Sequence, residues 1–441
     1  MYKPNRILAV LLVVVIGFAL ILAGCGSDEV SLDPADISGT ITFGGWPAGD
    51  DAVNSIIAGF NELYPNVTVE LEMTSTADHH DRLLASLAAR AGAPDVVMIE
   101  AEYIGAFRDR PGFVNLLDEP FNAGRFADDF VDFKWEHGVS IDGSQMVGLT
   151  WDIGPLTMFY NRRMFEAAGL PSDPDSVFEL MNSPEGFLEA ARAMHIPDER
   201  WLIGNAIDLI SARWSNRDFY NEDLSLRIDE PESVELIELA GQIRSEGLDA
   251  NVEMWGGEWT SLLGDNRLAI VSAGSWFGGF LKSWIAPDSE GDWGVARQPL
   301  FDSVNWGGSF LAIPAMSNNQ AAAWAFIEYM LTTVEAQNAM FAAVDYFPSL
   351  IPAWDDPFYD EPDPYFGGQR TRRLWADIAE RIEPSLVTPM DIETQGIFAS
   401  RVNVGIDAGE SAEIILADTI SEILRATAPE REALSARLGL D

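Results

Sequence analysis

Four tryptophans of this 441-residue chain stand in glycine-rich stretches without helix or strand periodicity. The segments read FGGWPAG, GLTWDIGP, SAGSWFGG and VNWGGS, and they contain Trp46, Trp151, Trp276 and Trp306. A neighbouring glycine lets a ligand or a backbone approach an aromatic ring closely. Flat aromatic faces beside carboxylates such as Asp152 suit a sugar, whose C–H faces are apolar and whose rim carries hydroxyls. Any one of these tryptophans could instead pack in the hydrophobic core. That alternative is weaker for all four together.

The usual motifs of covalent and phosphate chemistry are missing from the sequence. It contains no G-x-S-x-G, no phosphate-loop glycine-lysine pattern and no G-x-G-x-x-G. The four histidines (His79, His80, His137 and His195) lack the spacing of a helical zinc site. Carboxylates are too numerous to single out a catalytic pair, so a surface glycoside hydrolase, with two carboxyls about 5–10 Å apart, is the enzyme alternative. We expect a protein that is not an enzyme and holds no metal and no cofactor.

Alternating strand and helix patterns must position these residues. Apolar periodicity predicts strands and helices in turn over 39–44, 50–64, 67–73, 83–91 and 95–99. The same pattern returns with a helix over 231–247, a strand over 268–273 and a helix over 321–331, after which Thr332 and Glu335 fit a capping box. This is the pattern of an α/β protein with doubly wound parallel sheets. Trp46 and Trp276 follow predicted strands directly, where the ligand crevice of such sheets lies.

The N-terminus reads as an export signal. Lys3 and Arg6 precede an uncharged run of about sixteen residues, below the ~20 needed to span a bilayer comfortably. The run ends at L-A-G-C, which resembles a lipobox, and Cys25 is the only cysteine. We expect 1–24 to be removed, Cys25 to carry lipid, and 25–37 to form a polar tether. An uncut signal anchor or a free thiol is the alternative.

The charge composition limits the classes of molecule that the protein can bind. The chain has 70 acidic and 27 basic residues, a formal charge of −43, and only three lysines: Lys3, Lys134 and Lys282. A surface this acidic argues against binding nucleic acid or anionic lipid head groups. Scarce lysine fits a saline habitat or a GC-rich genome equally well. The length predicts two lobes, and we expect a monomer.

Several ordered segments resemble one family. GLTWDIGPLTMFYNRRMFEAAGLP (148–171) is similar to the region of carbohydrate-uptake binding proteins that reads roughly G-L-P-x-D-x-G-x-x-x-L-Y-Y-N-x-x-x-F-x-x-A-G-L. Further matching segments are DRLLASLAARAGAPDVVMIE (81–100), WGVARQPLF (293–301), NWGGSFLAIPAMSNNQAAAWAFIEYMLTTVEAQNAMF (305–341) and DYFPSL (345–350). The resemblance covers 38–425 and is to the extracellular solute-binding proteins of ABC transporters, of the maltose-binding type.

The resemblance implies a set of ligand contacts, to a mono- or oligosaccharide held between two lobes. The positions that match are Trp46, His79, Glu100, Trp151, Asp152, Asn205, Trp276, Trp306, Gly307 and Tyr346. The tryptophans and Tyr346 would stack on sugar rings, whereas Glu100, Asp152 and Asn205 would hydrogen-bond hydroxyls. Relatives often have an aromatic residue in place of His79, and Pro47 replaces their usual polar residue.

The resemblance also implies lobe boundaries and partners. Lobe one would hold 38–150 and 306–345, lobe two 151–305 and 346–441, with crossings near 150–153, 302–306 and 345–349. The lobes would close on the ligand by hinge bending and then dock on membrane permease subunits. Two alternatives remain at this point: a polyol phosphate gripped by Arg401, although an ion pair is the more ordinary role for that arginine, and a lipoprotein sensor that presents its ligand to a receptor.

Overall fold

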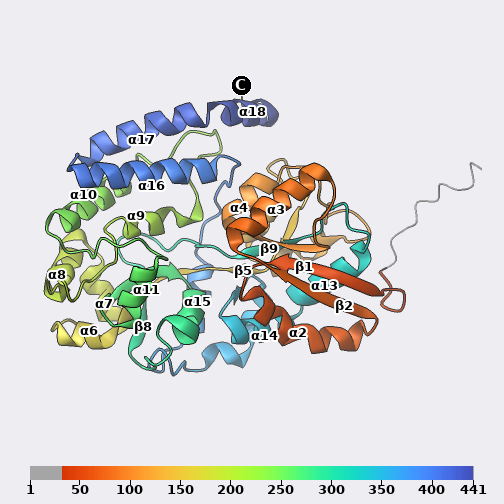
Figure 1. Cartoon of the computed structure of the whole chain (residues 1–441), viewed down its shortest axis with the longest axis horizontal. Helices are drawn as coiled ribbons and strands as arrows, with labels where there is room; N and C mark the ends of the chain where they lie inside the picture. The colour runs from red at the N-terminus through yellow and green to blue at the C-terminus, as the bar shows by residue number, and fades with distance from the viewer. Residues whose placement is uncertain (1–31, 441) are drawn as a thin grey trace, which may run out of the picture.

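Two β-sheets organise the molecule, whose computed structural model describes residues 32–440 (Figure 1). The first sheet has the order β2-β1-β3-β9-β4. Its strands are β1 (Gly39–Gly45), β2 (Val67–Met73), β3 (Val96–Glu100), β4 (Gly148–Thr150) and β9 (Ser309–Ala312). β1 runs parallel to β2 and β3, whereas β9 runs antiparallel to both β3 and β4. The α/β class expected from the sequence is confirmed, although this sheet is mixed and not wholly parallel.

Helices cover the first sheet. They are α2 (Gly49–Leu63), α3 (Thr76–Ala89), α4 (Ala101–Phe107), α5 (Asp132–Gly138), α13 (Gln320–Thr332) and α14 (Val334–Val344). The alternation in β1 puts Ile41 and Phe43 in the core, and α13 adds the fully buried Trp324. α3 begins earlier than the periodicity over 83–91 predicted, because the Ser75 hydroxyl caps it by accepting from the Asp78 amide at 3.2 Å.

One helix-start prediction was wrong. Thr332 and Glu335 do not form a capping box. The Thr332 hydroxyl donates instead to the Glu328 carbonyl in the preceding helix at 2.7 Å, and Thr333 is the cap position of α14, with no side-chain cap bond. Thr332 is still the last residue of α13, where a threonine hydroxyl commonly donates to the carbonyl one turn back.

The second sheet corrects the expectation of a parallel, doubly wound arrangement in both halves. It has the order β7-β6-β8, with β6 (Leu156–Asn161) antiparallel to both β7 (Ile270–Gly274) and β8 (Trp293–Arg297). The direction follows from the chain path. β6 starts at the boundary with the first sheet, whereas β7 and β8 end there, since Leu156 pairs with Gly274 and Thr157 with Arg297.

Helices also surround the second sheet. They are α6 (Arg162–Ala167), α7 (Pro174–Met181), α8 (Pro184–Met194), α9 (Asp208–Arg213), α10 (Pro231–Ser245), α11 (Gly257–Gly264) and α12 (Phe277–Phe280). A π-helix, η3 (Leu281–Ile285), continues α12. Short 3₁₀ helices elsewhere in the chain are η1 (Ala123–Asp129), η2 (Trp214–Asn216), η4 (Ile351–Asp355) and η5 (Pro357–Asp360).

Three stretches of chain pass side by side between the two sheets. β5 (Asp152–Ile153) pairs antiparallel with β10 (Phe347–Pro348). The third pass is held by backbone bonds from the Trp306 amide to the Gly154 carbonyl at 2.8 Å and from the Leu156 amide to the Val304 carbonyl at 2.9 Å. In Figure 1, β5 lies between the elements of the first sheet on the right and those of the second on the left.

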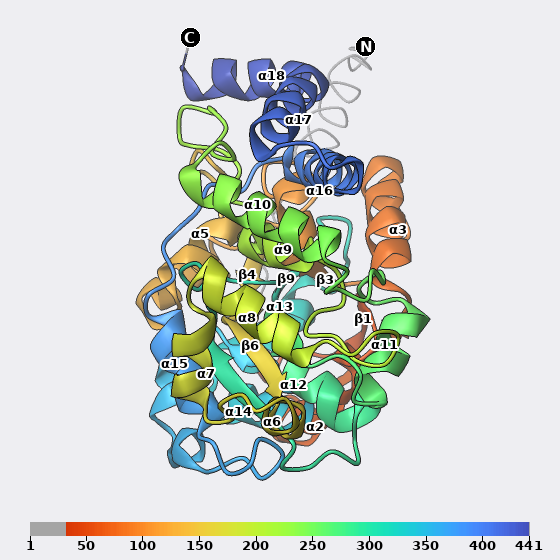
Figure 2. The same cartoon turned by 90° about the vertical axis from the view of Figure 1, so that its left-hand side faces the viewer.

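The C-terminal helices form a cap. α15 (Thr371–Ala379) packs beside the second sheet, and α16 (Asp391–Ala408), α17 (Ala412–Ala426) and α18 (Ala428–Leu438) lie above α9 and α10 in Figure 2. This region also contacts the first-sheet helices. Arg108 of α4's C-terminal end donates to the Val387 carbonyl at 3.1 Å, and Arg437 of α18 pairs with Asp109 at 3.1 Å.

Candidate binding site

The predicted contacts gather where the two sheets meet. Trp46 and Glu100 follow β1 and β3, and Trp276 follows β7. The three passes between the sheets bring Trp151, Asp152, Trp306, Gly307 and Tyr346, and α3 brings His79. Carboxyl ends of strands from different parts of the chain thus meet at one place, which is where open α/β sheets bind their ligands. Of the ten predicted positions, only Asn205 has its side-chain partners elsewhere.

A buried lysine that the motif analysis missed lies at the centre. Lys134 of α5 is fully buried; its Nζ donates to the Gly307 carbonyl at 2.8 Å and lies 4.6 Å from the centre of the Phe310 ring. Burial lowers the pKa of Lys134, while the nearby carboxylates of Asp152 and Glu100 act to raise it. A charged ammonium in this interior is stabilised by those two groups. The only sequence signal was its place among three lysines.

Asp152 is held in β5 with 2 % exposure. Its Oδ1 accepts from the Ser309 amide at 2.8 Å. Burial raises the pKa of Asp152 to about 6, and both Lys134 and the hydrogen bonds from Ser309 oppose that rise. A carboxylate with one oxygen fixed by the backbone and a cation beside it is a rigid acceptor.

Glu100 begins α4 and is half-buried. Its Oε2 accepts from the Glu102 amide at 2.7 Å, and its own amide donates to His80 Nε2 at 3.1 Å. Burial raises the pKa of Glu100, and the negative charge of Glu102 adds to that rise. The positive charges of Arg217 and Lys134 oppose it. Gly307 lies beside this carboxylate, with its Cβ position 3.6 Å from Glu100 Oε1, and its φ of +81° favours glycine.

His79 and His80 of α3 lie beside Trp46 and Glu100. His79 Nε2 bonds the Met98 carbonyl at 2.8 Å, and its ring meets Trp46 edge-on at 5.9 Å. His80 stacks on Tyr103 at 3.8 Å, bonds the Thr76 carbonyl through Nδ1 at 2.7 Å, and has its pKa lowered to about 4 by burial. His80 therefore stays neutral, with Nε2 free to accept from the Glu100 amide.

Trp276 and Trp306 form a crossed pair. The Trp276 indole N–H donates to the Trp306 carbonyl at 2.8 Å, and the rings lie 6.1 Å apart at 88°. Gly274 and Gly307 make room, because a Cβ at either would approach the Trp276 Nε1 within 2.4 and 3.2 Å respectively. Both rings are partly exposed, so each presents a surface beside the passes between the sheets.

Trp255 extends this pair and was not predicted. Its ring lies 5.8 Å from Trp276, tilted by 34°, and 45 % of the residue is exposed. Its φ of +70° is rare for a bulky side chain, and such strain is concentrated at functional sites. The sequence did carry a signal, since Trp255 precedes two glycines as Trp306 does.

The remaining aromatic positions are more enclosed. Trp151 is 1 % exposed, and its ring meets Tyr346 edge-on at 5.5 Å. Trp46 and Tyr346 are 9 % and 7 % exposed. Burial raises the pKa of Tyr346, with a hydrogen bond from the Trp46 side chain acting against the rise. In the arrangement described, these rings pack mainly on protein.

Asn205 has protein partners at both ends of its amide. Its Oδ1 accepts from Arg244 at 2.7 Å, and its Nδ2 donates to the Val252 carbonyl at 3.4 Å. Arg244 in turn pairs with Asp249 at 2.9 Å. These bonds tie the segment before α9 to α10 and to the loop at Val252, so the side chain of Asn205 has its partners within the second-sheet half.

A narrow polar gap separates the two halves beside Glu100. Arg217, which follows η2, pairs with Glu102 of α4 at 2.8 Å and so bridges the halves. The gap measures about 20 Å³ and is lined by Glu100, Trp306, Gly307, Asn216 and Arg217, among others. That space holds about one water molecule. A sugar ring does not fit into this gap in the arrangement described.

The family follows from comparison with known proteins. Residues 55–362 match the family model described as bacterial extracellular solute-binding protein. The chain belongs to this family. Family membership places this solute-binding protein outside the cytoplasm and makes it a binding protein rather than an enzyme.

Curated relatives and solved structures are similar over most of the chain. An arabinooligosaccharide-binding protein of Halalkalibacterium halodurans is 22% identical over 81% of this chain and 82% of the relative, and a lactose-binding protein of Rhizobium radiobacter is 23% identical over 83% and 86%. The ABC transporter associated binding protein of B. animalis subsp. lactis, solved with β-1,6-galactobiose, is 20% identical, covering 90% of this chain and 98% of that one, with a TM-score of 0.73. At this identity the structural likeness shows the fold.

Arg401 does not serve as a phosphate grip. It lies on α16 and pairs with Glu410 at 3.0 Å and with Asp418 at 2.7 Å, so two carboxylates already occupy its guanidinium. The polyol phosphate alternative needed this arginine between the lobes and is not supported. The ion-pair role expected for it is confirmed.

Residues 32–440 contain neither a candidate metal site nor a helix suited to crossing a membrane. Over that range, no cluster of His, Cys, Asp and Glu could hold a metal ion. Nor does any helix within it combine the length and apolar character that crossing a membrane requires. The expected signal peptide (1–24), the lipidation site Cys25 and the start of the tether lie outside the described residues.

Proposed function

We propose that this solute-binding protein captures a mono- or oligosaccharide between its two halves and delivers it to an ABC transporter. The observation that carries the proposal is the crossed Trp276–Trp306 pair, with Glu100 lining the same gap as Trp306. Partly exposed indole faces suit the C–H faces of a pyranose, and fixed carboxylates suit its hydroxyls. The relatives bind arabinooligosaccharide, lactose and galactobiose according to their names. These ligands support a sugar as the ligand class of this chain.

We propose further that the halves correspond to lobes that close by hinge bending. Lobe one would comprise 38–150 and 306–345, and lobe two 151–305 and 346–441, with hinges near 150–153, 302–306 and 345–349. The three adjacent passes at β5, β10 and Val304–Trp306 support this division. Two contacts of the C-terminal region cross the boundary between the lobes: Arg108 bonds the Val387 carbonyl, and Arg437 pairs with Asp109. The C-terminal region would therefore move against lobe one during opening.

The finer assignments are proposals of the same kind. The closed form would dock on permease subunits as a monomer, and lipid on Cys25 would tether it to the membrane. The residues that would touch the sugar are the predicted ones at the meeting of the sheets, with Trp255 added. Lys134 would act through Gly307 and Asp152, which it positions.

Calorimetric titration and thermal unfolding against a sugar panel test the function. The panel includes arabinooligosaccharides, lactose, β-1,6-galactobiose and maltose, with glycerol 3-phosphate as the anionic control. A cognate sugar at 100 times its Kd should add about 2.7 kcal/mol to the free energy of unfolding. Stabilisation by glycerol 3-phosphate without any stabilisation by sugars would overturn the proposal.

A further inference from the structure

A row of aromatic side chains leads from the crossed tryptophan pair to the surface of the second-sheet half. Trp276, Phe280 and Trp284 follow one another at intervals of four residues, with 5.5 Å between the first two rings and 5.8 Å between the last two. Trp255 flanks them, with its ring 5.8 Å from Trp276 and 6.2 Å from Phe280. These four residues form one continuous aromatic row.

Helix geometry keeps the row on one face. Residues four positions apart lie on nearly the same side of an α-helix, slightly past one full turn. The π-helix η3 that follows α12 has wider turns, so the next step of four residues falls short of a full turn and offsets that drift. Trp284 therefore lies on the same face as Trp276, on the order of 10 Å further along the axis. That distance exceeds the length of one sugar ring.

The outer members of the row are open to solvent. Trp284 is 52 % exposed and Trp255 is 45 % exposed, whereas Phe280 is half-buried. Among the large apolar side chains that are exposed in residues 32–440, only these two are aromatic. Exposed aromatic side chains that are gathered in one place, and not scattered singly, indicate a binding surface.

Ion pairs hold this surface in place. Lys282, which lies between Phe280 and Trp284 in sequence, pairs with Asp345 at 2.7 Å and with Asp363 at 2.8 Å. Both carboxylates belong to buried residues, so they anchor η3 on the body of the protein. Aromatic rings that are fixed before a ligand arrives lose little freedom when it binds.

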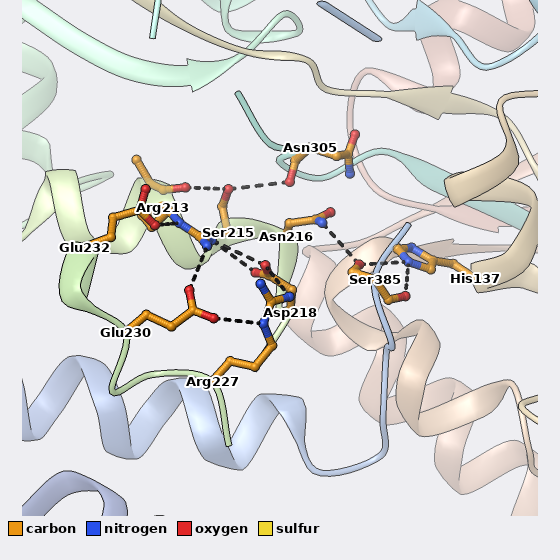
Figure 3. A network of polar contacts seen from close by, with 11 residues as sticks. His137, Arg213, Ser215, Asn216, Asp218, Arg227, Glu230, Glu232, Asn305 and Ser385 are labelled. Carbon is orange, nitrogen blue, oxygen red and sulfur yellow. Dashed lines mark hydrogen bonds and ion pairs between the residues drawn. The ribbon is translucent and has the colours of Figure 1, made fainter. Parts of the chain in front are cut away.

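Polar contacts between the halves border the gap beside Glu100. Figure 3 shows Ser385 between Asn216 and His137: Asn216 Nδ2 donates to Ser385 Oγ at 3.1 Å, and His137 Nε2 bonds the Ser385 carbonyl at 3.0 Å. His137 and Asn216 line the gap together with Trp306, whereas no residue of the aromatic row lines it. A ligand end that is held at Glu100 thus meets polar groups, and the row is the aromatic surface on which a longer ligand continues.

The chemistry of the row fits a chain of sugar rings. Its members offer one flat apolar face after another, and an oligosaccharide presents apolar C–H faces ring by ring. Exposed polar residues flank the row in sequence: Glu253 and Glu258 lie near Trp255, and Ser283 precedes Trp284. They keep the apolar surface narrow, as a single chain of rings requires, whereas a protein interface has a broader apolar core.

We propose that the aromatic row is an outer binding site for sugar rings, so that the ligand is an oligosaccharide longer than a disaccharide and is held by one end between the halves. Its first rings lie at Glu100 and the crossed tryptophans, and its later rings lie on Phe280 and Trp284. This proposal rests on the proposed capture of a sugar and adds the length of that sugar and the direction in which it extends.

Calorimetric titration of the full chain with sugars of increasing length tests the proposal. The probes are arabinobiose to arabinopentaose, maltose to maltopentaose, and β-1,6-galactobiose to its tetrasaccharide. In a series that binds, the longer sugars should bind more tightly than the disaccharide, because their additional rings reach Phe280 and Trp284. Trp284→Ala should weaken binding of the longest sugar by about tenfold, the effect of losing one stacked ring, and leave the disaccharide unchanged.

Matched variants separate stacking from effects on the fold. Trp284→Phe keeps a flat ring and should retain the dependence on sugar length. Ile414→Ala shortens an apolar side chain that is exposed to a similar extent, 53 %, on α17, and should leave every affinity unchanged. Trp276→Ala should weaken short and long sugars alike. The Tm of each variant is measured, and substitution of the exposed Trp284 should change it little.

The outcomes distinguish this proposal from the proposed function. Binding of disaccharides alone, equal affinities along a series, or a dependence on length that survives Trp284→Ala would overturn the outer site while sugar capture stands. Unchanged affinities in Trp284→Ala would also leave a protein partner as the occupant of the exposed rings. If no sugar of these series or of the wider panel binds, the proposed function fails and the outer site fails with it.

Discussion

The Lys134 ammonium and the Gly307 carbonyl are joined by a hydrogen bond of 2.8 Å across 173 positions of sequence. Through it, helix α5 of the first-sheet half holds the pass that carries Trp306. The same ammonium faces Asp152 and Glu100, so one buried cation sets the charge balance for two carboxylates. A substitution of Lys134 should therefore affect the site although Lys134 is not one of the predicted ligand contacts.

Lys134→Met removes this charge and keeps a side chain of similar length. We expect the free energy of unfolding to fall by about 3–5 kcal/mol, because Asp152 is left buried without its cation. Urea denaturation measures the loss. Adding Asp152→Asn should recover part of it, with a coupling energy of about 1–3 kcal/mol. Losses that simply add would show that the two side chains do not depend on each other.

Asp152 also predicts a pH dependence. Burial raises its pKa from 3.8 to about 6, so the folded protein binds this proton more tightly than the unfolded chain does. The stability that this proton contributes is present at about pH 4 and is lost as the pH rises to about 6. Asp152→Asn should remove that fall, which amounts to about 2–3 kcal/mol.

Urea denaturation at pH 4, 5, 6 and 7 compares the two proteins, with Asp142→Asn as the control. Hydrogen bonds from Ser144 and Ser140 lower the pKa of Asp142 to about 2, so its contribution changes only at lower pH. The control should therefore keep the wild-type slope. Equal slopes for wild type and Asp152→Asn would contradict a raised pKa at this position.

Trp276→Ala and Trp306→Ala should each weaken sugar binding by ~1–3 kcal/mol, about five- to 150-fold, a magnitude taken from stacking of nucleic-acid bases. Trp324→Ala, at a buried core ring, should instead reduce the free energy of unfolding by ~3–5 kcal/mol. Calorimetry and thermal unfolding on all three variants separate the effects. A large loss of stability with unchanged sugar affinity would identify Trp276 and Trp306 as core residues.

Hinge closure predicts a change in size. Small-angle scattering should show a smaller radius of gyration with saturating sugar than without it. Glu102→Gln, which weakens the Arg217–Glu102 bridge between the halves, should increase the radius of the sugar-free protein and leave that of the complex nearly unchanged. The effect is modest, since Glu102 is half exposed and such pairs contribute about 0–1 kcal/mol. An unchanged radius at saturation argues against closure.

Lipid on Cys25 predicts both the mass and the location of the mature protein. Protein from its native membrane should begin at Cys25 and carry acyl groups, and Cys25→Ser should release the protein from the membrane fraction. Mass spectrometry and fractionation measure these outcomes. An intact Met1, or an unmodified Cys25 on a cleaved chain, rules the anchor out.

Local pattern determined much of the first sheet and part of the site. Alternation around Ile41 and Phe43 specifies β1, and tryptophans beside glycines mark positions where a ring stays approachable. These features depend on neighbours in sequence and can be identified there. Trp255 carries the same signal.

Only the tertiary structure decided the polar interior. Lys134, Arg217 and Asn216 lie in segments without a distinguishing motif, and their roles come from atoms far away in sequence, such as the Gly307 carbonyl, the Glu102 carboxylate and the Ser385 hydroxyl. The antiparallel second sheet has the same origin, because its strand directions follow from where the chain passes between the halves. The capping pattern at Thr332 failed because α13 continues through this residue, so that its hydroxyl donates to the Glu328 carbonyl within the same helix. Periodicity reports which side of an element is buried, but partners across the molecule decide what a buried polar group bonds.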